Sequence, residues 1–321
     1  MKAVVQDRYG SADVLRIADV EMPVIGADDV LLRVRAASLH RGDWHVMTGV
    51  PSLIRVFGFG LRRPKGRIRG MDVAGVAHSV GSGVTDLKPG DEVFGVCRGA
   101  LAEYASASAR LLVKKPAGIS FEQAAAVPTS AVSALQALRD AGRLTAGQRV
   151  MVIGAAGGVG IYAVQLAKHL GGIVTGICST SKVELVTSLG ADTVIDYTRS
   201  DLGSERYDLI LDLAGNRKLS LLRRSLTPTG TLVIVGGENG GHILGGAQRI
   251  IGAMILSLVL RQRLTGFAAT HRPEDLLLLA DLLAAGSLTP VIHRVYPLSE
   301  AIDAMRMLES GDPQGKLIIT P

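Results

Sequence analysis

Aromatic residues are scarce in this sequence. Phe, Trp and Tyr make up 4% of its 321 residues, and there is a single Trp. Proteins that bind single-stranded nucleic acids stack the bases on aromatic side chains, so the composition argues against that class. The formal net charge of +6 permits a polyanionic partner, and a nucleic-acid-binding protein that retains an enzyme fold stays an alternative. Because the sequence carries no RNA-binding motif, we expect no nucleic-acid partner.

Cysteine is nearly absent, with Cys97 and Cys178 as the only two. Two thiols cannot build a four-cysteine zinc lobe or a disulfide framework, and this usage fits a reducing compartment. The first residues also lack the apolar core of a secretory signal. We therefore expect a cytoplasmic protein.

Long hydrophobic runs are missing as well. The longest, residues 250–260, contains Gly252 and Ser257 and is too short to cross a bilayer. We expect residues 245–260 to form a helix that is mostly buried. An alternative is a weak contact with a membrane surface, because a basic cluster adjoins an apolar loop. The cluster consists of Arg62, Arg63, Lys65, Arg67 and Arg69.

Glycine, by contrast, is dense in residues 154–160. An apolar run of strand character precedes this stretch, and apolar residues at helical spacing follow it. Strand, glycine turn and helix together are typical of a pyrophosphate site, because the backbone can approach the ligand and the first amides of the helix face the anion. The spacing of Gly154, Gly157 and Gly160 has one residue more than the standard motif. A tight turn without a ligand is the alternative.

The chain reads as α/β with two domains. Residues 1–110 are mostly β without helical periodicity, and residues 49–65 are a long loop. Ser120 and Gln123 form a capping box at a helix start. Alternating strands and helices then predict a parallel sheet covered on both faces. The strands are 150–153, 173–177, 193–196, 209–213, 231–235 and 264–269, and the helices are 130–142, 159–171, 181–189 and 216–226.

The last fifty residues depart from this alternation. They predict a helix over 274–285, strands over 292–296 and 317–320, and a helix over 299–310 between those strands. Such a tail can close a domain that began at the N-terminus, so we assign it to the first domain.

Across its whole length the sequence resembles the medium-chain dehydrogenase/reductase superfamily, in its zinc-lacking quinone oxidoreductase (zeta-crystallin-like) branch. The matching motifs are residues 33–39, 70–76, 80–84, 88–93, 154–160, 189–192, 212–215 and 315–317. The resemblance implies a GroES-like β-barrel catalytic domain (residues 1–122 and 271–321) and a Rossmann NADPH-binding domain (residues 123–270). It also implies an active site in the cleft between them and a homodimer that pairs the strands at 264–269.

The zinc-dependent branch of this superfamily holds a catalytic metal. Its ligand positions fall on His40, on Met71 and near Thr129, and one candidate ligand of three cannot hold catalytic zinc. We therefore expect no metal, with a replacement site at His40, Asp43 and His45 as the alternative. Zinc-free relatives carry asparagine at the His40 position and tyrosine near His45, so this chain differs from them at both places.

The turn after the second Rossmann strand predicts NADPH. NAD-preferring domains place an acidic residue about twenty residues beyond the glycine turn, and here Cys178 stands there, with no acid before Glu184. Ser179, Thr180 and Lys182 suit a 2′-phosphate instead; a solvated polar turn is the alternative. Gly236 and Gly237 follow the fifth strand, where such a sheet meets its ligand. The resemblance adds Ser133, Gly157, Gly158, Val159 and Tyr197 to the cofactor-binding set.

The expected reaction is NADPH-dependent reduction of a quinone or an α,β-unsaturated carbonyl. Without a metal to polarise an alcohol, acceptors that take hydride readily are favoured. His40, His45 and Asp43 are the candidate catalytic residues, since imidazole can donate a proton near neutral pH. Apolar residues from Trp44 to Phe59 are candidates for a substrate wall, and loop residues packed on the barrel are the alternative. A non-catalytic NADPH sensor is the alternative function.

Overall fold

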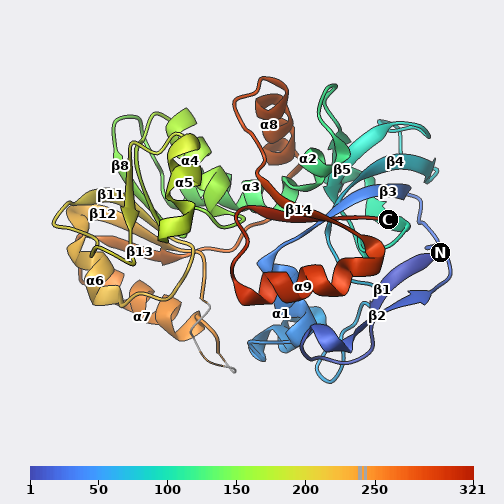
Figure 1. Ribbon diagram of the computed structural model, residues 1–321, viewed down its shortest axis with the longest axis horizontal. Helices are drawn as coiled ribbons and strands as arrows, with labels where there is room; N and C mark the ends of the chain where they lie inside the picture. Colours follow the sequence, from blue (N-terminus) through green and yellow to red (C-terminus); the bar gives the residue numbers. More distant parts are fainter. Residues whose placement is uncertain (238–240, 242–243) are drawn as a thin grey trace. The chain divides into compact units, whose positions relative to one another are not determined.

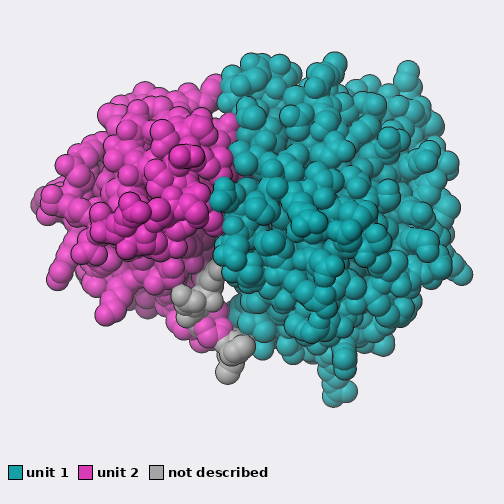
Figure 2. Space-filling view, in the orientation of Figure 1, with its two compact units in different colours: residues 1–132, 271–321 teal, residues 133–270 magenta. Residues whose placement is uncertain are grey.

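The chain divides into two compact units (Figure 2). Unit 1 comprises Met1–Val132 and His271–Pro321, and unit 2 comprises Ser133–Thr270. The computed structural model describes residues 1–237, 241 and 244–321, apart from the side chain of Phe57. Unit 1 extends ten residues beyond the boundary expected at residue 122, because helix α2 (Phe121–Ala125) packs against the sheet of unit 1.

Unit 1 is built on a sheet of order β14-β15-β3-β4-β5-β7, and β6 also pairs with β3. Strand β3 is the longest, and most of its residues are buried because it lies inside the sheet. A separate β1-β2 hairpin completes the β structure in the described part of this unit. The strands are β1 (Lys2–Gln6), β2 (Leu15–Asp19), β3 (Asp29–Leu39), β4 (Asp72–Val80), β5 (Glu92–Val96), β6 (Tyr104–Ser108), β7 (Leu112–Lys114), β14 (Ile292–Pro297) and β15 (Lys316–Thr320).

Strand register brings the C-terminal tail to the centre of unit 1. Strand β15 pairs antiparallel with β3, with Leu317 opposite Leu39. Strand β4 pairs with the other edge of β3, with Asp72 opposite Ser38. The ends of three strands that are distant in sequence therefore meet next to His40.

Helix α1 (Arg41–Thr48) corrects the expectation that residues 1–110 contain no helix. Asp43 starts it by accepting the backbone N–H of His40 at 3.0 Å, and Gly49 ends it in the left-handed region at φ 64°. One further turn, the π-helical segment Arg55–Phe59, lies in the stretch expected to be a loop. The other helices of unit 1 are α8 (Pro273–Ala284) and α9 (Ala301–Ser310).

Unit 2 is a parallel sheet of order β10-β9-β8-β11-β12-β13. Its strands are β8 (Arg149–Ile153), β9 (Ile173–Cys178), β10 (Thr193–Asp196), β11 (Tyr207–Asp212), β12 (Leu226–Ile234) and β13 (Arg263–Gly266). This order confirms the doubly wound fold, in which ligands bind where the order reverses. Here that point lies between β8 and β11, at their carboxyl ends.

Helices cover both faces of this sheet (Figure 1). Helices α4 (Gly160–His169) and α5 (Val183–Ser188) lie on one face, and α6 (Leu219–Arg224) and α7 (Ala247–Ser257) lie on the other. Helix α3 (Pro128–Gln136) continues into a π-helical turn, Ala137–Ala141. Within the described residues no helix combines the length and hydropathy needed to span a membrane.

Helix α7 was expected to be mostly buried, and this expectation is wrong. Ala253 faces the core, but a run of large apolar side chains faces outward instead. These exposed residues are Ile251, Met254 and Ile255 on α7, and Leu258 and Val259 in the turn that follows it. The hydrophobic composition of residues 245–260 is the same for a helix buried in the core and for a helix that also presents apolar side chains on its outer face. Composition alone therefore could not predict the exposure of this helix.

Candidate functional site

The glycine turn after β8 forms a backbone cradle. Gly154 has φ 85°, and a Cβ placed on Gly160 would lie 2.1 Å from the carbonyl oxygen of Gly154. Glycine is therefore required at both positions. Helix α4 starts at Gly160, and Val159 at its N-cap offers no side-chain cap. The amides of Ile161 and Tyr162 already donate to the carbonyls of Gly157 and Val159. Among the described contacts this leaves the amides of Gly158, Val159 and Gly160 to meet an anion, so the geometry fits a nucleotide pyrophosphate.

A second close backbone approach lies at the ends of β11 and β12. A Cβ on Gly236 would meet the carbonyl oxygen of Leu213 at 1.9 Å. Asp212 is fully buried and accepts the backbone N–H of Gly215 at 2.9 Å, and it also pairs with Arg249. These contacts fix Gly236 and Gly237 at the edge of the sheet where the strand order reverses. Ser133, the remaining cofactor candidate of unit 2, is buried on α3.

The last residue of β10 brings to the end of β9 a carboxylate that sequence reasoning missed. Asp196 lies directly opposite Cys178 in the register of β10 and β9. Thr180 donates to its Oδ2 at 2.5 Å. This hydrogen bond is the main cause that holds the pKa of Asp196 below its usual range. An acid thus lies beside the expected position in space, although no acid lies there in sequence.

Tyr197 follows Asp196 and is 52% exposed. The guanidinium of Arg217 lies 5.9 Å from the centroid of its ring. Lys182 is partly buried at the end of the short turn Thr180–Lys182. The structure therefore gathers an aromatic ring and cationic side chains near Ser179 and Thr180, in the arrangement that suits an adenosine phosphate.

In unit 1, His40 and Asp43 form a buried pair at the start of α1. His40 Nε2 lies 3.4 Å from Asp43 Oδ2, and it has no hydrogen-bond partner within the described residues. The backbone N–H of Asp43 donates to the carbonyl oxygen of His40 at 2.9 Å, so the two residues are held together at the start of the helix. Burial raises the pKa of Asp43, and the His40 ring opposes this rise. A Cβ on Gly42 would lie 2.7 Å from His40 Cε1, so glycine leaves room for the ring.

His45 has a different environment. Its Nδ1 lies 2.6 Å from the carbonyl oxygen of Val50, which can only accept, so this nitrogen carries the proton. The neighbouring Trp44 donates from Nε1 to Glu309 at 3.1 Å and packs against the core of unit 1. Trp44 is therefore part of the packing between α1 and α9. Val56 and Phe59, further along the same stretch, are exposed.

A buried lysine that was not among the predicted residues lies near His40. Lys316 is 1% exposed; its Nζ donates to Ser130 Oγ at 2.8 Å and lies 3.8 Å from Asp72 Oδ2. Asp72 Oδ1 accepts both the backbone N–H and the hydroxyl of Thr129. Burial lowers the pKa of Lys316, and the carboxylates of Asp72 and Asp43 oppose this change. Asp72 and Lys316 each begin an otherwise apolar strand. A charged residue at such a position is the sequence signal from which this network could have been predicted.

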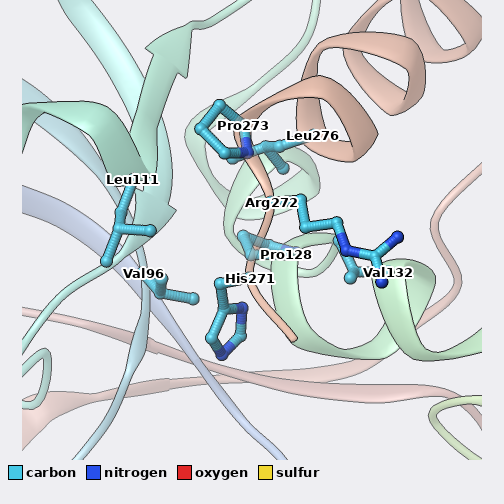
Figure 3. Close-up of a pocket in the computed structure, with 8 residues that line it drawn as sticks. All are labelled: Val96, Leu111, Pro128, Val132, His271, Arg272, Pro273 and Leu276. Atoms are coloured by element: carbon cyan, nitrogen blue, oxygen red, sulfur yellow. The ribbon is translucent and has the colours of Figure 1, made fainter. Parts of the chain in front are cut away.

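His271 was also missed. Together with Val96 and Leu276 it lines a cavity of about 10 Å³, which has room for one water molecule at most (Figure 3). Burial lowers the pKa of His271, while the nearby Asp72 carboxylate opposes this change. The ring is therefore neutral at pH 7. This cavity is too small for a substrate.

The two cysteines are both free and buried. Burial raises the pKa of the Cys97 thiol, and the carboxylates of Asp72 and Asp43 add to the rise. Burial likewise raises the pKa of Cys178. Within the described residues, no group of three His, Cys, Asp or Glu side chains is arranged to hold a metal ion.

Comparisons with known proteins agree with this geometry. The family model described as alcohol dehydrogenase GroES-like domain matches residues 26–117, and the one described as zinc-binding dehydrogenase matches residues 189–319. A 2-methylene-furan-3-one reductase of Solanum lycopersicum is 34% identical over 340 residues, which cover 100% of this chain and 79% of that protein.

Two further relatives are close in sequence or structure. The chloroplastic NADPH-dependent alkenal/one oxidoreductase of Arabidopsis thaliana is 33% identical over 340 residues, which cover 100% of this chain and 80% of that protein. The solved quinone oxidoreductase of Coxiella burnetii has a TM-score of 0.85 and 30% identity, and the match covers 100% of this chain and 99% of that one. The chain therefore belongs to the medium-chain dehydrogenase/reductase superfamily, in its zinc-lacking quinone oxidoreductase branch.

Proposed function

We propose that this protein is a zinc-independent, NADPH-dependent oxidoreductase that reduces a quinone or an α,β-unsaturated carbonyl. The observation that carries the proposal is the uncapped start of α4 behind the cradle at Gly154–Gly160, at the reversal point of the sheet. Names of relatives support the substrate class, because they include alkenal/one oxidoreductase and 2-methylene-furan-3-one reductase. When bound, the nicotinamide supplies the hydride.

The cofactor site in this proposal lies in unit 2. Gly157, Gly158 and Val159 hold the pyrophosphate at the start of α4, and Gly236 and Gly237 leave room for the nicotinamide half, to which Ser133 also contributes. Ser179, Lys182 and Tyr197 hold the adenosine 2′-phosphate. The alkenal/one relative is named as NADPH-dependent, which supports the phosphorylated nucleotide. We assign Thr180 to the same turn, and its role is developed in the next subsection.

His40 is the proposed proton donor to the acceptor oxygen. Its Nε2 is buried and has no partner among the described residues, so it can offer its proton to a substrate atom. Asp43 holds the backbone of His40 in place through its own N–H and its carboxylate, and that carboxylate lies 3.4 Å from Nε2 of the ring. His45 is a weaker candidate, because its Nδ1 is tied to the carbonyl of Val50.

The test is NADPH oxidation with a panel of quinones, enones, enals and simple alcohols. We expect quinones or enones to be reduced and saturated alcohols to be inert. His40→Ala should lower the rate on the best acceptor by roughly 10–100-fold without changing NADPH affinity. His78→Ala is the matched control, since that exposed ring packs on Tyr104 in the same unit. An unchanged rate in His40→Ala would remove His40 from the mechanism, and ethanol oxidation faster than any reduction would refute the function.

We further propose that the protein is a homodimer. Strand β13 is an edge of the sheet in the described residues, and an open edge invites pairing with another chain. Helix α7 packs beside it, and five large apolar residues of α7 and of the turn after it are exposed. A second copy paired through β13 would cover this surface.

A cytoplasmic location is also part of the proposal, supported by the two unpaired thiols.

A further inference from the structure

The carboxyl ends of β9 and β10 hold a compact polar cluster in unit 2. Thr180 donates to Asp196 Oδ2 at 2.5 Å, and Thr198 donates to Asp196 Oδ1 from both its backbone N–H (2.9 Å) and its hydroxyl (2.7 Å). The two threonine hydroxyls are themselves 2.8 Å apart. Arg199 Nε lies 3.6 Å from Asp196 Oδ2. The carboxylate is therefore well supplied with donors.

The cluster has fewer hydroxyl protons than oxygen–oxygen contacts. Each threonine hydroxyl carries one proton, and three oxygen–oxygen contacts of 2.5, 2.7 and 2.8 Å share the two protons. The hydrogen bonds and the nearby Arg199 guanidinium keep the pKa of Asp196 low, so the carboxylate supplies no third proton at neutral pH. The hydroxyl of Thr180 is committed inside the cluster. It has no proton left to donate to a phosphate.

Asp196 also occupies a meaningful place. In dinucleotide-binding sheets that prefer the nucleotide without a 2′-phosphate, an acid at the end of the second strand accepts the ribose 2′-hydroxyl. Cys178 fills that position in this chain, and Asp196 is its direct neighbour on the adjacent strand. The side chain of Asp196 is 14% exposed. A carboxylate of the kind that binds an unphosphorylated ribose is thus present, but its oxygens already accept hydrogen bonds from Thr180 and Thr198.

We propose that Thr180 covers Asp196 and thereby sets the choice of cofactor indirectly. Covered, Asp196 cannot accept the 2′-hydroxyl of NADH, while the ammonium of Lys182 and the guanidinium of Arg199 offset its charge and favour the 2′-phosphate of NADPH. Uncovered, Asp196 becomes an acceptor for the ribose and repels the phosphate. This inference rests on the proposed function, because it concerns the same nucleotide site.

The experiment compares wild type with Thr180→Val, which replaces the hydroxyl by a methyl group that cannot stay within 2.5 Å of Asp196 Oδ2 and so uncovers the carboxylate. Dissociation constants are measured by calorimetry for NADPH and NADH, and also for 2′,5′-ADP and 5′-ADP as fragments that report only this end of the site. We expect Thr180→Val to bind NADH and 5′-ADP more tightly and NADPH and 2′,5′-ADP more weakly. The ratio of the two affinities should shift toward NADH by about tenfold or more, the scale of one hydrogen bond to a charged group.

Two further variants separate this role from others. Adding Asp196→Asn to Thr180→Val should abolish the gain in NADH binding, and Asp196→Asn alone should leave NADPH binding undiminished. Thr187→Val is the matched control, since the hydroxyl of this exposed threonine on α5 donates to the Val183 carbonyl among the described contacts; no affinity should change.

Three outcomes would overturn the inference while leaving the proposed function intact. In Thr180→Val, a loss of NADPH affinity with unchanged NADH affinity would make Thr180 a direct phosphate ligand. Four unchanged affinities would remove it from the site. Weaker NADPH binding in Asp196→Asn alone would make Asp196 an anchor of the turn. If folded wild type binds none of the four nucleotides, the proposed function itself fails, and the inference fails with it.

Discussion

Three charged side chains near His40 are buried in unit 1. Lys316, Asp72 and Asp43 are each at most 3% exposed, although isolated charges are costly to bury. The cost of burying the Lys316 ammonium is offset by its hydrogen bond to Ser130 and by the nearby Asp72 carboxylate. Removing one partner of such a pair leaves the other charge uncompensated, and this usually costs more than the pair itself contributes.

We predict that Lys316→Met destabilises unit 1 by about 3 kcal/mol at pH 7. The pKa of Lys316 is lowered in the folded state, so the unfolded chain binds more protons as pH rises toward the ordinary lysine value. The contribution of Lys316 to stability therefore increases with pH in this alkaline window, and the cost of the substitution should be larger at pH 9.5 than at pH 7.

Urea unfolding followed by fluorescence measures this cost. The single tryptophan, Trp44, lies in unit 1 and reports on it directly. Lys114→Met is the control, because Lys114 is 62% exposed in its pair with Asp91 and should cost less than about 1 kcal/mol at either pH. A cost for Lys316→Met that is constant or decreases with pH would contradict a lowered pKa of Lys316 in the folded state.

At the scale of elements, two glycines of the turn between β8 and α4 are required for different reasons, one for packing and one for ligand binding. A Cβ on Gly160 would overlap the backbone, whereas a Cβ on Gly157 has its nearest described neighbour at 3.4 Å, an ordinary contact. Gly160 is therefore needed for the close approach of helix and strand. Gly157 is needed only if a ligand lies against the backbone.

We predict opposite patterns for the two alanine variants. Gly157→Ala should retain the melting temperature of wild type within a few degrees and bind NADPH at least about tenfold more weakly, since its methyl group occupies the cradle. Gly160→Ala should lose about 1–3 kcal/mol of stability through overpacking, together with binding. Calorimetric scanning and nucleotide titration measure both quantities. Full NADPH affinity in Gly157→Ala would mean that the pyrophosphate does not lie on this turn.

The same scale shows what the sequence can predict. Strong periodic patterns predicted the six strands of unit 2 within a few residues, and the capping box at Ser120 and Gln123 is formed as expected. Helix α1 was missed because its start depends on His40 and Asp43, and histidine is not a usual capping residue. Asp196 was missed because strand pairing, not sequence distance, places it beside Cys178.

At the scale of the whole molecule, the exposed apolar surface of α7 and of the turn after it is the feature that a monomer does not explain. Leu258 and Val259 are 85% and 80% exposed, and a patch of this kind usually marks an interface. We predict that Ile255→Glu together with Val259→Glu converts a dimer into a monomer. Light scattering at micromolar concentration measures the change, with Val24→Glu in unit 1 as the control because Val24 is 94% exposed. A wild-type mass of a single chain would refute the dimer.

The burial of the two cysteines has a consequence for a protein that handles such acceptors. Quinones and enones are soft electrophiles, and thiolates are the nucleophiles that attack them most readily. Cys97 and Cys178 are both buried, and the pKa of each is raised, so neither offers a thiolate at neutral pH. These are the only cysteines in the chain. The proposed enzyme is thus chemically inert toward its own substrates at the residues that such substrates would otherwise alkylate.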